Sequence, residues 1–188
     1  MTVTVGIDEV GRGCLAGPVV ACSVYFGGSD NYPDEWDYLK LHLNDSKKLS
    51  KSKLAKINHV LINSPFVHYR LSARSAPVVD SVNILQATFQ CFRSVARDGD
   101  FYHIIDGNMY PISQPGRSVI KADGEFMECM AASIIAKVFR DKLMSRLALR
   151  YPFYKWESTA GYGTKAHMDG IQRYVLTGHH RRSVIKGV

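Results

Sequence analysis

The sequence predicts one α/β domain over residues 1–188, with a mixed central β-sheet flanked by helices. Strand-like segments come first along the chain and then alternate with segments whose apolar residues recur at helical spacing. The length of 188 residues falls within the range of one domain with a full hydrophobic core. No linker, internal repeat or low-complexity stretch divides the chain, so we expect a single catalytic or binding unit.

Several hydrophobic segments have the pattern of β-strands: residues 2–9, 18–26, 65–74, 101–106 and 118–122. In the first of these, Val3, Val5 and Ile7 alternate along the chain and therefore share one face. The second is apolar over most of its length, which indicates a largely buried strand. A cluster of glycine, serine, aspartate and asparagine at residues 27–31 predicts a turn after it.

Helices are predicted over residues 51–62, 79–97, 125–149 and 165–176. The third has an apolar stripe formed by Met127, Met130, Ala131, Ile134 and Val138. Its basic residues lie away from that stripe, at Lys137, Arg140 and Arg146. Small side chains at residues 131–133 should let this helix approach the sheet closely. Residues from about 151 to 188 are expected to form a helical C-terminal element.

The composition favours a polyanionic partner. Lys and Arg number 24 against 17 Asp and Glu, which gives a net charge of +7 and a pI near 9.3. Basic proteins without such a partner are common, so charge alone indicates nucleic acid without specifying it. The longest apolar runs fall well short of the ~18 residues needed to span a membrane. With a strand starting beside Met1 and no signal peptide, we expect a cytoplasmic protein.

The cysteines are expected to be buried free thiols. None of them forms a C-x-x-C pair, and no paired histidine pattern accompanies them. Each is flanked by apolar residues, which fits burial in a reducing compartment. These residues are Cys14, Cys22, Cys91 and Cys129. The sequence therefore argues against a structural zinc site.

Three aspartates share a local setting that indicates a metal site. Asp8, Asp106 and Asp123 each end a hydrophobic segment, with a glycine close behind. An isolated acidic residue in such a place is more often a turn former or a helix cap. Three repetitions favour a joint site, because ligand sites of α/β domains lie at strand ends. Carboxylate oxygens indicate magnesium, with manganese as a substitute. Asp123 is also expected to cap a helix that begins at Gly124.

Glu9 follows Asp8 directly and poses a geometric problem. Neighbouring side chains of a regular strand point to opposite faces, so both carboxylates cannot serve one site without distortion. We therefore predict that the chain bends at Glu9, where Gly11 and Gly13 make a turn inexpensive.

Two other acidic residues compete for a place in the site. Asp141 lies eighteen residues after Asp123, a separation of roughly 27 Å along a helix, which makes it an unlikely co-ligand. Glu128 is nearer but points about 140° away from Asp123 on a helical wheel. For Glu128 we retain only a minor supporting role as an alternative.

Taken together, these segments resemble those of type 2 ribonuclease H, ribonuclease HII. The opening motif is Gly-Ile-Asp-Glu-Val-Gly-Arg-Gly at residues 6–13. The other matching segments are residues 15–19, 44–50, 82–88, 105–108, 121–123, 131–138 and 161–167. Each motif is weak by itself, whereas their occurrence in the same order over almost the whole chain is specific. The resemblance implies a ribonuclease H-like α/β fold.

The resemblance also implies an activity and a metal site. The reaction would be endonucleolytic hydrolysis of the RNA strand of RNA/DNA hybrids and incision on the 5′ side of ribonucleotides embedded in duplex DNA. Asp8, Glu9, Asp106 and Asp123 would be the catalytic, metal-binding carboxylates, holding two Mg²⁺ or Mn²⁺ ions. Such a pair of ions suits in-line phosphodiester cleavage, which leaves 3′-hydroxyl and 5′-phosphate ends.

Substrate contacts are implied at six further positions. The turn of Gly11, Arg12 and Gly13 would read the 2′-hydroxyl and the phosphates at the junction of RNA and DNA. The group that distinguishes ribose from deoxyribose is that hydroxyl. Contacts with the phosphate backbone and with the following sugar would come from Ser46, Lys47 and Tyr162. The protein would act as a monomer.

The sequence departs from the family pattern in two places. Glu125 and Glu128 add negative charge near Asp123, which bears on metal affinity. The ending is only weakly preserved, and its basic residues would either contact duplex DNA or be disordered. These residues are Arg181, Arg182 and Lys186. Two alternative functions remain: a ribonuclease HIII, and a non-catalytic nucleic-acid binding protein that keeps the fold.

Overall fold

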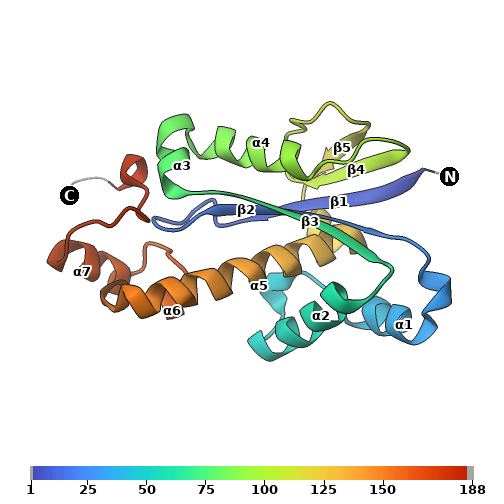
Figure 1. Cartoon of the computed structure of the whole chain (residues 1–188), viewed down its shortest axis with the longest axis horizontal. Coiled ribbons are helices and arrows are strands. Elements are labelled where there is room, and N and C mark those ends of the chain that lie inside the picture. The colour runs from blue at the N-terminus through green and yellow to red at the C-terminus, as the bar shows by residue number, and fades with distance from the viewer. Residues whose placement is uncertain (1, 186–188) are drawn as a thin grey trace.

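A five-stranded mixed sheet forms the centre of the computed structural model, which describes residues 2–185 (Figure 1). The strands are β1 (Val3–Val10), β2 (Val19–Phe26), β3 (Val67–Arg74), β4 (Phe101–Asp106) and β5 (Gly116–Val119). Their order across the sheet is β3-β2-β1-β4-β5. The pairs β1–β2 and β2–β3 are antiparallel, whereas β1–β4 and β4–β5 are parallel. The predicted α/β fold with a mixed sheet is confirmed.

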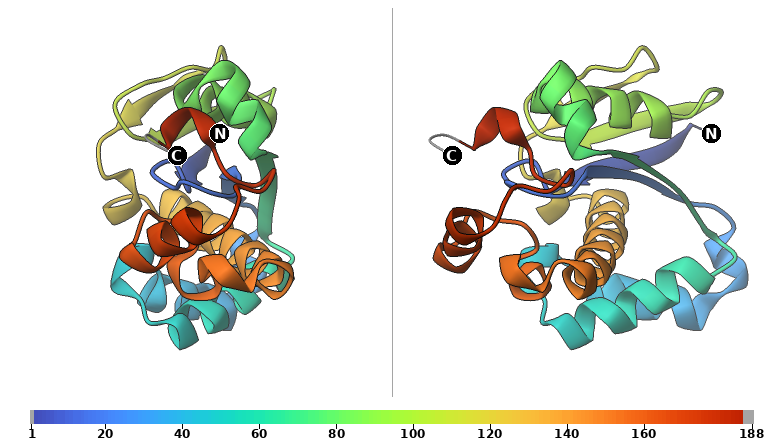
Figure 2. Two further views of the ribbon diagram at one scale, coloured as in Figure 1. Left: turned by 90° about the vertical axis from the view of Figure 1, so that its left-hand side faces the viewer. Right: turned by 60° about the vertical axis from the view of Figure 1, so that its left-hand side comes forward.

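Helices cover both faces of this sheet (Figures 1 and 2). They are α1 (Pro33–His42), α2 (Lys51–Asn63), α3 (Ala76–Val82), α4 (Ile84–Val95), α5 (Met127–Arg150), α6 (Trp156–Thr159) and α7 (Lys165–Arg173). On one face lie α3 and α4, and on the other lies α5 with α1 and α2 outside it. The last two, α6 and α7, pack beyond the C-terminal end of α5.

Each face of the sheet has its own hydrophobic core. Val5 and Ile7 of β1 pack with α3 and α4, as the predicted alternation requires. Val20, Cys22 and Val24 of β2 face α5, α2 and α1. The four cysteines are buried free thiols, which confirms that prediction for the described residues. No helix in residues 2–185 combines the length and the apolar character needed to cross a membrane.

The predicted helix over residues 79–97 is wrong, because two helices occupy this region. They meet at Asn83, whose φ of 66° lies in the left-handed region and interrupts the helical hydrogen-bond series. The Asn83 side chain accepts a hydrogen bond from the amide of Gln86 and so caps α4. A further helix, α1, was not predicted, and α7 ends at Arg173 instead of 176.

The predicted strand over residues 118–122 is displaced. The strand β5 ends at Val119, Lys121 has a left-handed φ of 62°, and a 3-10 turn follows at residues 122–124. Asp123 therefore lies in this turn and does not end a strand. It does not cap α5 either, because α5 starts at Met127 and its N-cap residue is Phe126.

The sheet and α5 approach each other closely at Gly6. A Cβ atom at this position would lie 2.3 Å from the backbone nitrogen of Cys129 and from the carbonyl carbon of Glu128. Opposite this strand α5 presents small, fully buried side chains, including Ala131 and Ala132. Glycine in β1 thus allows α5 to cross directly over the strand that carries Asp8.

We expect Gly6→Ala to lower the free energy of unfolding by about 2–3 kcal/mol, because the helix and strand backbones must separate to admit the methyl group. Chemical denaturation of the two proteins measures this difference. Gly178→Ala is the matched control, since a Cβ atom there meets nothing within 4 Å. Equal losses of stability in both variants would contradict the close approach.

Candidate active site

Three carboxylates from separate segments converge at one end of the sheet. One oxygen each from Asp8, Asp106 and Asp123 lies within 4.8 Å of the other two. The parallel register pairs Ile7 of β1 with Ile105 of β4, so the next residue of each strand is an aspartate at the same level. Asp123 joins them from the turn after β5. The predicted convergence of these aspartates is therefore present.

Backbone and side-chain donors fix the three carboxylates. The amide of Glu9 donates to Asp8 Oδ1 at 2.7 Å, and the amide of Ala122 donates to Asp106 Oδ1 at 2.8 Å. The Lys47 ammonium lies 3.5 Å from Asp123 Oδ2. Asp8 and Asp123 are each only 5% exposed. The acidic groups are thus held in place close together and with little access to water.

Burial and mutual repulsion disfavour the charged forms of these groups. Burial, followed by the charge of Glu9, raises the pKa of Asp8 well above its ordinary value. Burial also raises the pKa of Asp106, and the charge of Asp123 adds to this, although the Ala122 amide opposes it. A divalent cation would relieve this repulsion, and oxygen ligands of this kind suit Mg²⁺ or Mn²⁺. The residues present therefore fit a metal ion.

The predicted bend at Glu9 is wrong. Glu9 pairs with Ala21, and the antiparallel ladder with β2 continues to Val10, so the strand stays regular through both carboxylates. The chain turns only at Gly11, which has a φ of 88°. Glu9 instead lies beside the cluster: its carboxylate is 3.3 Å from Arg12 Nη1. Burial raises its pKa, and the charge of Asp106 contributes to the rise.

The turn after β1 leaves polar backbone groups on the surface. Arg12 and Gly13 are exposed, and in the described part of the chain neither amide N–H donates to a protein acceptor. The Arg12 side chain is 48% exposed beside Glu9. Gly11 cannot carry a side chain, because a Cβ atom would lie 2.2 Å from Arg140 Nε. This turn therefore offers free donors next to the acidic cluster.

Two of the implied phosphate contacts differ in accessibility. The Lys47 side chain is 79% exposed and lies at the rim of the cluster. Ser46 is buried, and its hydroxyl lies 2.9 Å from that of Ser133. Ser133 lies near Asp8, and its hydroxyl partly offsets the rise in the pKa of Asp8 that burial causes. The Ser46 hydroxyl thus points toward Ser133 inside the protein and not toward the surface.

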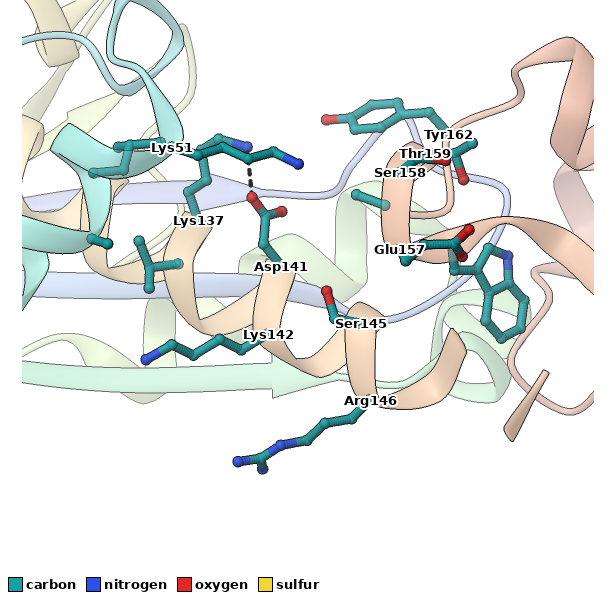
Figure 3. Close-up of a pocket in the computed structure, with 15 residues that line it drawn as sticks. Lys51, Lys137, Asp141, Lys142, Ser145, Arg146, Glu157, Ser158, Thr159 and Tyr162 are labelled. Carbon is teal, nitrogen blue, oxygen red and sulfur yellow. Dashed lines mark hydrogen bonds and ion pairs between the residues drawn. The ribbon is translucent and has the colours of Figure 1, made fainter. Parts of the chain in front are cut away.

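A groove of about 490 Å³ runs beside Tyr162 (Figure 3). Its basic lining residues are Lys51, Lys137, Lys142 and Arg146, and its acidic ones are Asp141 and Glu157. Lys137 and Asp141 pair at 3.0 Å. The Tyr162 ring is 45% exposed at one end of this groove. Asp141 therefore lies among these cations, as expected from its distance along the helix, and Glu128 lies outside the group of converging carboxylates.

Two buried arginines were not predicted. Arg140 was assigned to an exposed face of its helix and Arg181 to a DNA-binding or disordered ending, yet both are 0% exposed. Arg182 is exposed, and its amide donates to Asp80 at 3.0 Å. Lys186 lies outside the described residues. The residues next to these arginines give no sequence signal of such burial, because the acceptors are backbone carbonyls distant in the chain.

The mixed sheet, with its acidic cluster at one end, has the ribonuclease H-like fold. The model of the family "Ribonuclease HII" matches residues 5–186. The chain therefore belongs to the ribonuclease HII family, whose members are endoribonucleases that act on RNA/DNA hybrids.

Curated relatives support this assignment. The chain is 40% identical over 185 residues to the ribonuclease HII of Macrococcus caseolyticus, covering 96% of this chain and 66% of that protein. It is 42% identical over 183 residues to the ribonuclease HII of Rhodospirillum rubrum, covering 95% of this chain and 82% of that protein.

Solved structures share the fold at low sequence identity. The ribonuclease HII in the complex with PCNA from Archaeoglobus fulgidus superposes with a TM-score of 0.80 at 20% identity, over 99% of this chain and 96% of that one. The ribonuclease H2 of Pyrococcus horikoshii gives a TM-score of 0.72 at 21% identity, over 96% and 93% of the two chains.

A Bst-RNase HIII structure in complex with Mn²⁺ gives a TM-score of 0.59 at 16% identity, over 92% of this chain and 70% of that one. The fold is therefore common to type 2 enzymes that differ widely in sequence.

The raised pKa of Asp8 leads to a prediction about stability. Without metal, the folded state holds this proton more tightly than the unfolded chain does. Stability of the metal-free protein therefore falls as the pH rises from about 4, the ordinary aspartate value, through the raised pKa. Asp8→Asn removes the buried charge and is expected to raise the free energy of unfolding at neutral pH by about 1–3 kcal/mol.

Thermal unfolding at pH 5 and pH 8, with and without Mg²⁺, checks this expectation. Mg²⁺ should stabilise the unsubstituted protein and have little effect on the Asp8→Asn variant, because ligands bind the folded state through this cluster. Asp141→Asn is the control outside the cluster and should respond to Mg²⁺ normally. An identical response of all three proteins would refute a metal site at Asp8.

Proposed function

We propose that this protein hydrolyses the RNA strand of RNA/DNA hybrids and incises duplex DNA on the 5′ side of embedded ribonucleotides, using two divalent metal ions. The observation that carries the proposal is the position of the Gly11–Gly13 turn, exposed at Arg12 and Gly13, shortly after Asp8 in the chain. A metal-binding cluster and free backbone donors thereby lie next to each other. This arrangement suits a site where a phosphate is cleaved beside a recognised ribose.

The carboxylates of Asp8, Asp106 and Asp123 would hold the metal ions, and the family resemblance adds Glu9 as the fourth ligand. When bound, Mg²⁺ or Mn²⁺ supplies activation of water and stabilises charge on the leaving 3′ oxygen. The Glu9 and Ala122 amides keep Asp8 and Asp106 oriented. The Glu9 carboxylate pairs with Arg12 at 3.3 Å, and the charge of Asp106 contributes to the raised pKa of Glu9, which supports a place for Glu9 beside the cluster.

Ribose recognition is assigned to the turn. The N–H groups of Arg12 and Gly13 are free to donate to a 2′-hydroxyl, which is the atom that RNA has and DNA lacks. The Arg12 guanidinium has the fork geometry that suits phosphate oxygens. Gly11 makes the turn possible because its φ is positive and Arg140 lies where a side chain would be.

Groups near the turn are assigned to the parts of the substrate that flank the ribonucleotide. Lys47 contacts a phosphate, and Tyr162 packs against the sugar that follows the ribonucleotide. The basic groove beside Tyr162 attracts the phosphate backbone of the duplex. Ser46 has a supporting function through Ser133 and does not contact phosphate itself. All of these groups belong to one copy of the chain, so we propose that it acts as a monomer.

The incision assay uses matched duplexes that contain zero, one or several ribonucleotides, together with a long RNA/DNA hybrid. In Mg²⁺ or Mn²⁺ we expect cleavage on the 5′ side of a single ribonucleotide, with 3′-hydroxyl and 5′-phosphate ends, and none of the all-DNA duplex. Gel analysis with end-specific ligation identifies the products. Cleavage of the long hybrid with refusal of the single ribonucleotide would instead favour a ribonuclease HIII-like specificity.

Asp106→Asn is expected to lower the turnover number by about 10³-fold or more, because several kcal/mol of metal-mediated charge stabilisation is lost. Duplex binding should persist, since the turn and the basic groove are unchanged. Single-turnover kinetics and a binding titration separate the two effects. Asp34→Asn, at an exposed aspartate of α1 outside the cluster and the groove, is the matched control and should retain activity; unchanged turnover in Asp106→Asn would remove Asp106 from the catalytic site.

A further inference from the structure

Two buried guanidinium groups lie beneath the segment that joins β1 to β2. Arg140 of α5 and Arg181 near the end of the described chain are both 0% exposed. Within residues 2–185 neither has a carboxylate within ion-pair distance. A buried charge without a carboxylate is unfavourable unless other polar groups solvate it. Here the solvating groups are backbone carbonyls, most of them in the joining segment, and Arg181 Nη2 is left without a partner in the described residues.

Arg140 connects that segment to the chain beside Tyr162. Its Nε donates to the Pro18 carbonyl at 2.9 Å and its Nη2 to the Ala16 carbonyl at 3.0 Å. Its Nη1 donates to the Ala160 carbonyl at 2.8 Å. The planar guanidinium can bridge three carbonyls in different directions, which a lysine ammonium on a flexible stem cannot do as rigidly. Arg140 thus holds two substrate-facing segments in one arrangement.

Arg181 contacts the exposed turn itself. Its Nη1 donates to the Arg12 carbonyl at 2.9 Å, and its Nε donates to the Gly17 carbonyl at 3.0 Å. The backbone around it is also fixed, because the Arg181 amide donates to the Leu15 carbonyl and the Gly17 amide to the His179 carbonyl, both at 2.8 Å. Burial lowers the pKa of Arg181 to about 10, so the group is still a cation at neutral pH.

The bond to the Arg12 carbonyl determines where the next amide points. In a planar trans peptide the C=O and the following N–H point in opposite directions. The Arg12 carbonyl faces the buried guanidinium, so the Gly13 N–H faces away from it, toward the surface. Gly13 is exposed, and its N–H has no protein acceptor in the described part of the chain. Arg181 therefore fixes the orientation of a free donor beside the acidic cluster.

We propose that Arg181, together with Arg140, is a positioning residue for ribose recognition, which holds the Arg12–Gly13 peptide so that its N–H meets the 2′-hydroxyl of the substrate. The inference rests on the proposed function, because it concerns the preference for ribose at the proposed active site. The two arginines that support this preference lie outside that site. Arg181 itself does not touch the substrate. Its guanidinium geometry, and not its charge, carries the effect.

The first test compares Arg181→Lys with Arg182→Lys. Both variants keep the charge, but only Arg181 contributes its side chain to the turn, since the recorded hydrogen bond of Arg182 uses its backbone amide. Affinities are measured without divalent metal for a duplex with one ribonucleotide and for the same all-DNA duplex. We expect Arg181→Lys to lose at least 10-fold of the preference for the ribonucleotide, with all-DNA affinity changed less than 2-fold. Arg182→Lys should keep the preference.

The second test observes the turn directly. The Gly13 amide resonance of the unsubstituted protein should shift when the ribonucleotide duplex is added, and it should be broadened or displaced in free Arg181→Lys. Arg140→Lys is the second variant, because it reaches the same segment through other carbonyls, at Ala16 and Pro18. Mg²⁺ binding by calorimetry should be unchanged in both variants, since the carboxylates are untouched.

Several results overturn the inference. One is a folded Arg181→Lys variant with full ribonucleotide preference, and another is an unperturbed Gly13 resonance in that variant. Loss of the whole fold in both variants, seen as collapse of amide dispersion, would make the arginines general fold residues. If the unsubstituted protein itself shows no ribonucleotide preference, the proposed function fails, while the Gly13 resonance still reports whether Arg181 orients the peptide.

Discussion

The parallel pairing of β1 with β4 is the constraint on which the site depends. It sets Ile7 against Ile105, and the aspartate after each of them then falls at the same edge of the sheet. Side chains along a β-strand alternate between the two faces of the sheet. A register shift of one residue would therefore turn Asp8 to the opposite face. The close crossing of α5 over Gly6 adds a second restraint on the same strand.

The acidic cluster and the turn at residues 11–13 are stabilised by different means. The carboxylates repel one another and are held by amide donors, so their arrangement is costly until a cation binds. The turn is held from behind by cations that meet only carbonyl oxygens. Negative groups thus form the cluster, whereas positive groups lie behind the exposed turn next to it. Along the chain, only the short stretch from Asp8 to Arg12 separates the acidic cluster from the turn that the two buried arginines hold.

The parts of this arrangement that follow from local pattern could be predicted from the sequence. Alternation located β1, a hydrophobic segment that ends in Asp106 located β4, and helical spacing located α5, so the convergence of Asp8 and Asp106 was foreseeable. Asp123 was correctly grouped with them, but its turn was not, because a left-handed Lys121 has no clear signature. The break at Asn83 was missed for the same reason, since backbone conformation there depends on tertiary contacts.

Features that depend on distant partners could not be predicted. Arginine on a helix or near a chain end is normally exposed, and nothing near Arg140 or Arg181 indicates acceptors more than a hundred residues away. Glu9 is a related case. The expected alternation of side chains along the strand was correct, but the inferred bend was not, because β2 continues to pair with both Asp8 and Glu9.

The bond between Arg181 and Arg12 also has a consequence for how the protein is made. These residues are 169 positions apart, so the turn after the first strand is completed only when nearly the last described residues have been synthesised. Closing such a long loop is slow compared with forming local helices, and chains fold from the N-terminus during translation. The three clustered carboxylates, in contrast, are all synthesised by residue 123. A nascent chain therefore contains every member of the acidic cluster well before it contains the arginine that fixes the turn beside it.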